Sequence, residues 1–128
     1  MIENLPPKVQ NQIAQFQQLS QQIQMIATQK MQLEAQVREL DKAVQELEKA
    51  ADDALVYRSV GSLMIQNKDR AGLLTELKER KDSLDVRVKT LDRQDKHLRE
   101  RHQNLQAQIT QALQGSGGGD SDDAPKAG

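Results

Sequence analysis

Apolar residues recur at intervals of three and four along most of this chain. Taking Val9 as position a, one heptad frame runs unbroken over residues 5–54, and thirteen of its fifteen a and d sites are apolar. About seven consecutive heptads exceed the three or four that distinguish a coiled coil from an amphipathic surface helix. A second segment, residues 67–113, repeats leucine every seven residues from Leu77 to Leu105. The pattern therefore predicts two long helices, 5–54 and 67–113, that pair as a coiled coil.

Residues 55–66, between the two periodic segments, are rich in β-branched and apolar side chains. Their centre is Gly61-Ser62, and glycine at the first central position is what a two-residue type II′ turn requires. Such a turn predicts two cross-strand pairs, Val60 with Leu63 and Arg58 with Ile65. A plain helix–helix loop is the alternative, although such loops usually have roughly 2–8 residues. The predicted hairpin residues are Val56, Tyr57, Val60, Gly61, Leu63, Met64 and Ile65.

The central turn makes the two helices antiparallel neighbours, and their charges favour this pairing. Residues 1–54 carry five basic and eight acidic side chains, a net charge of −3, and residues 55–113 carry twelve and eight, a net charge of +4. The a and d rows of each helix form the seam of the predicted coiled coil. Lys30 is a charged residue in the seam of the first helix and Asp95 in that of the second, and antiparallel pairing places them within about one helical turn of each other along the axis. Either the two residues fix the register, or Lys30 extends to water with its stem buried.

The predicted β-hairpin has apolar side chains on both faces, because Leu55, Tyr57 and Met64 fall on one set of positions and the valines and Ile65 on the other. A two-stranded sheet alone is marginal in water, and no other part of this chain is available to cover it. We therefore expect hairpins of several chains to join. The predicted fold class is all-α-dominated: a long antiparallel coiled-coil helical hairpin with a single central β-hairpin that joins an oligomeric β-barrel.

The opposite end of the coiled coil lacks charge. No charged residue occurs from Val9 to Gln29, and none occurs from His102 to Gly119 if histidine is neutral. Antiparallel pairing brings these two stretches to the same end, where an exposed apolar surface can contact other chains without charge selectivity. A second helix–helix contact or a fraying end are the alternatives. The candidate binding residues at this tip are Leu5, Val9, Ile13, Phe16, Leu19, Ile109 and Leu113.

Composition excludes several classes of function. The absence of cysteine removes disulfides and thiolate sites, and it fits a reducing cytoplasm. His97 and His102 are five residues apart and lack the partners of a metal site, and no phosphate-binding loop is present. We therefore expect no catalytic residue, metal or cofactor, and the protein is not expected to be an enzyme. A net charge of −1 argues against nucleic acid, and no apolar run is long enough for a membrane.

Two local features remain, the start of the second helix and the C-terminal tail. The second helix has two candidate N-caps, Asn67 and Asp69, and the sequence does not choose between them. Residues 114–128 are rich in Gly, Ser and Asp and have nothing to bury, which predicts a disordered tail. The predicted organisation is therefore one domain over residues 1–113 followed by the tail.

Two stretches resemble the prefoldin family, specifically the beta-type subunit of the archaeal kind. One is the central run over residues 53–65 (DALVYRSVGSLMI), and the other is the leucine-plus-charge repeat over residues 84–95 (LDVRVKTLDRQD). The resemblance covers about residues 5–113, and a single β-hairpin is the beta-type arrangement. It implies a cytoplasmic, ATP-independent chaperone in which two alpha-type and four beta-type subunits join hairpins into a β-barrel platform. The tips of the coiled coils would bind unfolded client proteins and deliver them to a group II chaperonin.

A structural coiled-coil tether or scaffold subunit is the competing interpretation. A tether would saturate with one defined partner, whereas a chaperone of this kind suppresses the aggregation of unrelated denatured proteins.

Overall fold

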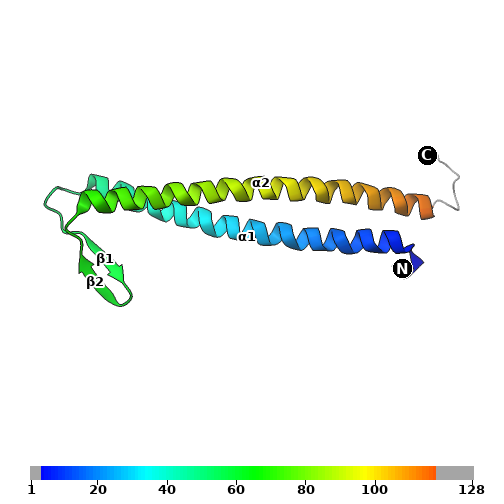
Figure 1. The fold of residues 1–128 in the computed structure, drawn as a ribbon, viewed down its shortest axis with the longest axis horizontal. Coiled ribbons are helices and arrows are strands. Elements are labelled where there is room, and N and C mark those ends of the chain that lie inside the picture. Colours follow the sequence, from blue (N-terminus) through cyan, green and yellow to red (C-terminus); the bar gives the residue numbers. More distant parts are fainter. Residues whose placement is uncertain (1–3, 118–128) are drawn as a thin grey trace. The chain divides into compact units, whose positions relative to one another are not determined.

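The computed structural model describes residues 4–117, which form two long helices and two short strands (Figure 1). In chain order these are α1 (Pro7–Lys49), β1 (Tyr57–Val60), β2 (Leu63–Gln66) and α2 (Arg70–Gly117). The prediction of a mostly helical fold with one central antiparallel hairpin is confirmed. Neither helix, over the described residues, has a stretch long and apolar enough to cross a membrane.

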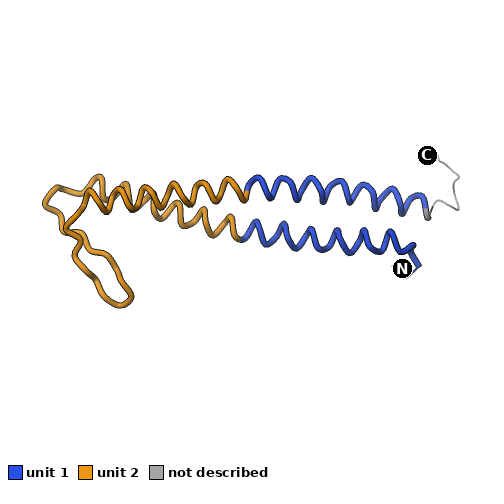
Figure 2. Tube along the Cα trace, viewed as in Figure 1, with its two compact units in different colours: residues 1–28, 92–128 blue, residues 29–91 orange. Residues whose placement is uncertain are grey.

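The chain divides into two compact units, coloured separately in Figure 2. The terminal unit, in its described part, comprises residues 4–28 and 92–117, and the hairpin unit comprises residues 29–91. Each unit contains a part of both helices.

In the terminal unit the helices run antiparallel. Gln12 Nε2 donates to Gln108 Oε1 at 3.4 Å, and Ser20 Oγ lies 2.9 Å from His102 Nε2. Residues early in α1 therefore contact residues late in α2. Val9 is buried in this unit, as expected for an a position of the predicted seam.

In the hairpin unit the helices are also antiparallel, and two ion pairs join them. Lys81 Nζ lies 3.0 Å from Asp41 Oδ1, and Lys78 Nζ lies 3.2 Å from Glu48 Oε2. The buried side chains of this unit are Leu33, Val44 and Leu47. All three occupy a or d positions of the predicted frame, so the heptad pattern located the core of this unit correctly.

The helix ends differ from the predicted bounds, and local hydrogen bonds explain why. Helix α1 stops at Lys49 and not at residue 54, because the remaining seam positions carry only alanine and Asp52-Asp53 occupies the centre of a turn. That turn is closed by a bond from the Ala54 N–H to the Ala51 carbonyl at 3.0 Å. Burial by alanine is too small to extend the helix against these turn-forming aspartates.

Helix α2 begins at Arg70 and not at residue 67, since Asp69 is its N-cap. Asp69 Oδ1 accepts from the Gly72 N–H at 2.9 Å, and the Asp69 N–H donates to Asn67 Oδ1 at 3.0 Å. The choice between the two caps is thus resolved in favour of Asp69, with Asn67 forming the turn that precedes it. At its other end α2 continues through residues 114–117, the start of the predicted tail. The rest of that tail lies outside the described residues.

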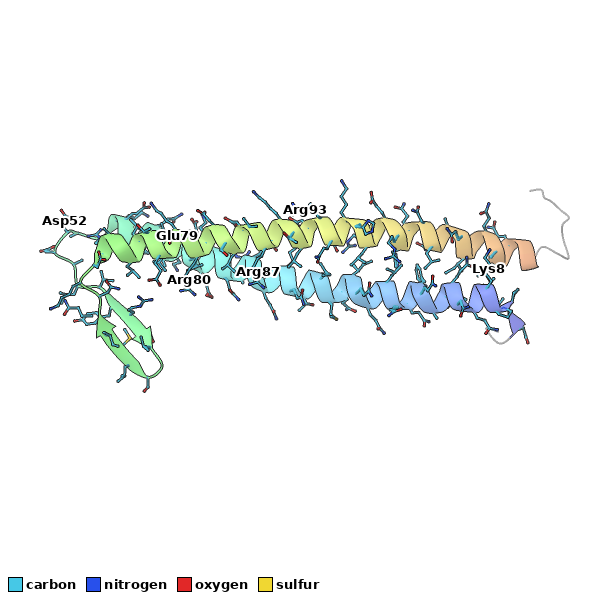
Figure 3. All side chains as sticks on the ribbon, viewed as in Figure 1. Lys8, Asp52, Glu79, Arg80, Arg87 and Arg93 are labelled. Carbon is cyan, nitrogen blue, oxygen red and sulfur yellow. The ribbon has the colours of Figure 1, made fainter. Side chains whose placement is uncertain are left out.

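Arg70 closes the end of α1 from the first turn of α2. Its guanidinium donates to the carbonyls of Leu47, Ala50 and Ala51, in the last turn of α1 and just beyond it, at 2.5, 2.5 and 2.7 Å. Asp52, marked in Figure 3, lies 3.8 Å from the same side chain. A single side chain from α2 therefore binds carbonyls at the C-terminal end of α1.

Replacing Arg70 with lysine should destabilise the protein by about 2 kcal/mol, because a compact ammonium cannot reproduce a three-carbonyl fork. Urea denaturation followed by circular dichroism measures this change. The matched control is Arg38→Lys, an exposed arginine of α1, which should alter stability by less than about 0.5 kcal/mol. Equal effects of the two substitutions would contradict the capping role.

The β-hairpin has the predicted register. Four pairs join β1 and β2: Tyr57 with Gln66, Arg58 with Ile65, Ser59 with Met64, and Val60 with Leu63. Gly61 has a φ of +59°, and no residue other than glycine has a positive φ among the described residues. A type I′ turn would need a positive φ at Ser62 as well, so the turn fits type II′. The Asn67 N–H adds one more bond, to the Val56 carbonyl at 2.7 Å.

Candidate functional site

All eight strand residues of the hairpin are exposed. Because side chains alternate along a strand, one face carries Tyr57, Ser59, Met64 and Gln66. The other, which we call the apolar face, carries Val56, Val60, Leu63 and Ile65 around Arg58. Val60, Leu63 and Ile65 are 51%, 63% and 48% exposed, and only Val56 is half-buried. The structure thus brings the predicted hairpin residues together and leaves nearly all of them uncovered.

Both edges of the two-stranded sheet lack a partner strand within residues 4–117. In an antiparallel hairpin with a two-residue turn, the pair beside the turn exchanges hydrogen bonds with itself, and the next pair directs its backbone groups outward. The outward groups therefore belong to Tyr57 and Ser59 on β1 and to Met64 and Gln66 on β2. Such edges are templates for a strand of another chain.

A hollow of about 510 Å³ separates β1 from the helices of the same unit. Its apolar wall includes Leu47, Leu73 and Leu77 from the helices and Val56 and Tyr57 from the hairpin. Arg80, which is labelled in Figure 3, also lines the hollow. An added strand or side chain at the β1 edge would find apolar surface on both sides.

One ion pair connects the hairpin to α2. Arg58 Nη2 donates to Glu76 Oε2 at 2.8 Å, and Nη1 lies 3.4 Å from Oε1. The hydrogen bond and then the charge of Arg58 lower the pKa of Glu76 below its ordinary value of 4.5. The pair therefore contributes above about pH 4.5 and is lost as pH falls through the lowered pKa. The sequence analysis missed Glu76, because nothing in a heptad pattern indicates which residue meets a strand.

The predicted tip residues all belong to the terminal unit, within residues 5–19 and 109–113, but two of them are not exposed. Val9 and Leu19 are only 5% and 6% exposed. The expectation of an exposed surface at these positions is corrected, because they are a and d residues whose side chains pack across the seam. Leu113 is exposed, and the remaining tip residues are half-buried: Leu5, Ile13, Phe16 and Ile109.

Polar side chains interrupt the seam of the terminal unit. The His102 ring stacks on Phe16 with centroids 4.0 Å apart. The Ser20 hydroxyl donates to the Phe16 carbonyl at 3.1 Å, which leaves its oxygen to accept from His102 Nε2. Gln12 Oε1 is buried without a hydrogen-bond partner among the described residues. These polar side chains make the pairing of the two helices less stable here than an all-apolar seam would, since a buried polar atom without a hydrogen-bond partner costs free energy.

The ion pair between Lys81 and Asp41 joins the two helices of the hairpin unit, and the sequence analysis did not predict it. The hydrogen bond to Asp41, and then its charge, raise the pKa of Lys81 above its ordinary value of 10.5. The pair therefore contributes at neutral pH and is lost only as pH rises through the raised pKa. Asp95, chosen from the sequence as the partner of Lys30, accepts from Arg99 one turn along its own helix at 2.9 Å. Coupling between Lys30 and Asp95 stays a prediction.

No group of three His, Asp or Glu side chains within residues 4–117 is placed to hold a metal ion. The candidate surfaces among the described residues are the uncovered hairpin and the end of the terminal unit, which lacks Asp, Glu, Lys and Arg over residues 9–28 and 102–117.

Comparisons with known proteins agree with this geometry. The family model described as "Prefoldin subunit" matches residues 10–116. The prefoldin subunit beta of Methanothrix thermoacetophila is 49% identical over 113 residues, which cover 88% of this chain and 93% of that protein. The prefoldin subunit beta of Thermococcus kodakarensis is 40% identical over 113 residues, covering 88% and 95%.

A solved structure extends the likeness to three dimensions. The crystal structure of the prefoldin beta subunit from Thermococcus strain KS-1 matches with a TM-score of 0.77 at 39% sequence identity. The match covers 86% of this chain and 96% of that one.

Proposed function

The chain belongs to the prefoldin subunit family, whose members are chaperone components, and from this we propose that it is a subunit of an ATP-independent chaperone that binds unfolded proteins at its charge-free end. The family resemblance seen in residues 53–65 and 84–95 is confirmed. Family membership also implies assembly with other prefoldin subunits.

The observation that carries the assembly part of the proposal is the uncovered hairpin. Its large apolar residues are about half exposed or more, and no strand in the described part of the chain pairs with either sheet edge. Contiguous exposed apolar surface of this kind marks an interaction site, and strand addition satisfies the edges at the same time. We infer that hairpins of several subunits join into one β-barrel platform. The expected composition is two alpha-type and four beta-type subunits.

Client binding is assigned to the tip of the terminal unit. Its half-buried and exposed apolar residues lie among glutamines, and the stretches 9–29 and 102–119 contain no Asp, Glu, Lys or Arg. Apolar contact is non-directional and therefore tolerates many client sequences. Val9 and Leu19 can contact a client only when the two helices separate locally. The polar side chains in the seam of this unit lower the free energy that this separation requires. Because the proposed mechanism is independent of ATP, a client is released when another protein competes for it or when it is transferred to a group II chaperonin in the cytoplasm.

The test reconstitutes this chain with an alpha-type prefoldin subunit and dilutes two unrelated denatured proteins into the complex. Light scattering should fall for both clients without ATP, at concentrations near one complex per client. A structural tether predicts a different outcome, in which the complex forms but neither client is protected. That result would overturn the chaperone assignment and leave the assembly intact.

A further inference from the structure

Arg58 is the one charged side chain on the apolar face of the hairpin. It lies directly across from Ile65, and Val56 and Val60 flank it on its own strand. A guanidinium left over this face would have to lose its water when another subunit covers the face. Burying an unpaired charge in that way is strongly unfavourable.

In the structure the Arg58 guanidinium does not lie over the apolar face. It leaves the sheet and forms a two-atom contact with the carboxylate of Glu76 on α2, at 2.8 and 3.4 Å. In the isolated chain both side chains are about two-fifths exposed, at 43% and 41%. An exposed pair of this kind adds little to the stability of a free subunit, so stability alone gives no reason for it.

We propose that Glu76 is the counter-ion that holds the Arg58 guanidinium off the apolar face, so that this face can be buried against another prefoldin subunit. The inference rests on the proposed assembly through the hairpin and adds a positioning residue on α2. Its effect on the free subunit is small, and its effect on association is large. In an assembled state the Arg58 guanidinium lies beside a covered apolar face, where leaving it without its counter-ion costs far more than at an open surface.

Three variants test the proposal in complexes with an alpha-type prefoldin subunit, with dissociation followed by mass photometry over a dilution series. Glu76→Gln removes the counter-charge and keeps the size, and it should raise the dissociation constant about tenfold or more. Arg58→Met removes the charge that needs neutralising, so its complex should be as tight as the wild type or tighter. The double variant should behave like Arg58→Met alone.

The matched control is Glu79→Gln, which removes the same charge one turn along α2, at the position labelled in Figure 3. It should leave association unchanged. Thermal unfolding of each free variant checks that the helices persist, and Tyr57 on β1, the only tyrosine of the chain, reports burial of the hairpin by its fluorescence.

Two results would overturn the proposal. Association of Glu76→Gln that equals the wild type would show that no counter-ion is needed. Weak association of Arg58→Met would show that the guanidinium contacts the partner directly. In both cases the wild-type complex still forms, so failure of this inference is distinct from failure of the proposed assembly, in which the wild-type chain would not associate at all.

Discussion

Val60→Asp is expected to prevent assembly with an alpha-type prefoldin subunit, with the dissociation constant rising on the order of a hundredfold or more. Val60 lies on the apolar face beside the turn and is 51% exposed in the free chain. The free subunit therefore tolerates the carboxylate at a cost of about 1 kcal/mol in strand preference. An assembled hairpin would have to bury the charge. Sedimentation of the mixed subunits measures the mass of the complex directly.

Ser62→Asp is the matched control, because it places the same charge in the exposed turn and not on the apolar face. It should assemble as the wild type does. Circular dichroism should show both variants equally helical, since α1 and α2 carry most of the secondary structure. A Val60→Asp chain that forms a complex of wild-type mass would remove the hairpin from the assembly interface.

Periodic features of this fold could be predicted from the sequence because each depends on neighbours close along the chain. The five apolar side chains that are buried among the described residues, including Leu33 and Leu47, all lie on the predicted a and d rows. Gly61 fixed the turn, and the turn fixed the register of every cross-strand pair. Where one residue type and one spacing decide a structure, inspection of the sequence is sufficient.

Features that depend on contacts between distant segments could not be predicted. The end of α1 depends on Arg70, whose guanidinium binds carbonyls some twenty residues earlier. The role of Glu76 depends on where the hairpin projects relative to α2. Lack of charge selected the tip as a binding surface, which stays a prediction, and it did not reveal that Val9 and Leu19 are buried. Composition indicates which residues are apolar, and packing decides which of them are exposed.

Deleting residues 1–16 together with 105–128 should leave assembly intact and sharply reduce protection of clients. The cut removes Val9 and Phe16 from α1 and Ile109 and Leu113 from α2, while the hairpin unit, residues 29–91, is untouched. Each tip binds weakly, and several tips on one platform act together. Losing the apolar end of every beta-type subunit should therefore raise the complex concentration needed for half-maximal protection roughly tenfold or more. Light scattering of a diluted denatured client, at equal concentrations of assembled complex, measures this change.

The control for this deletion removes residues 118–128 alone, which leaves α2 complete to Gly117. It should protect clients as well as the full chain does. A second comparison separates exposed from buried tip residues: Leu113→Ser removes an exposed apolar side chain and should lower protection without lowering the melting temperature, whereas Val9→Ser opens the buried seam and should lower the melting temperature. Full protection by the complex that lacks both helix ends would place the client surface elsewhere and refute the tip assignment.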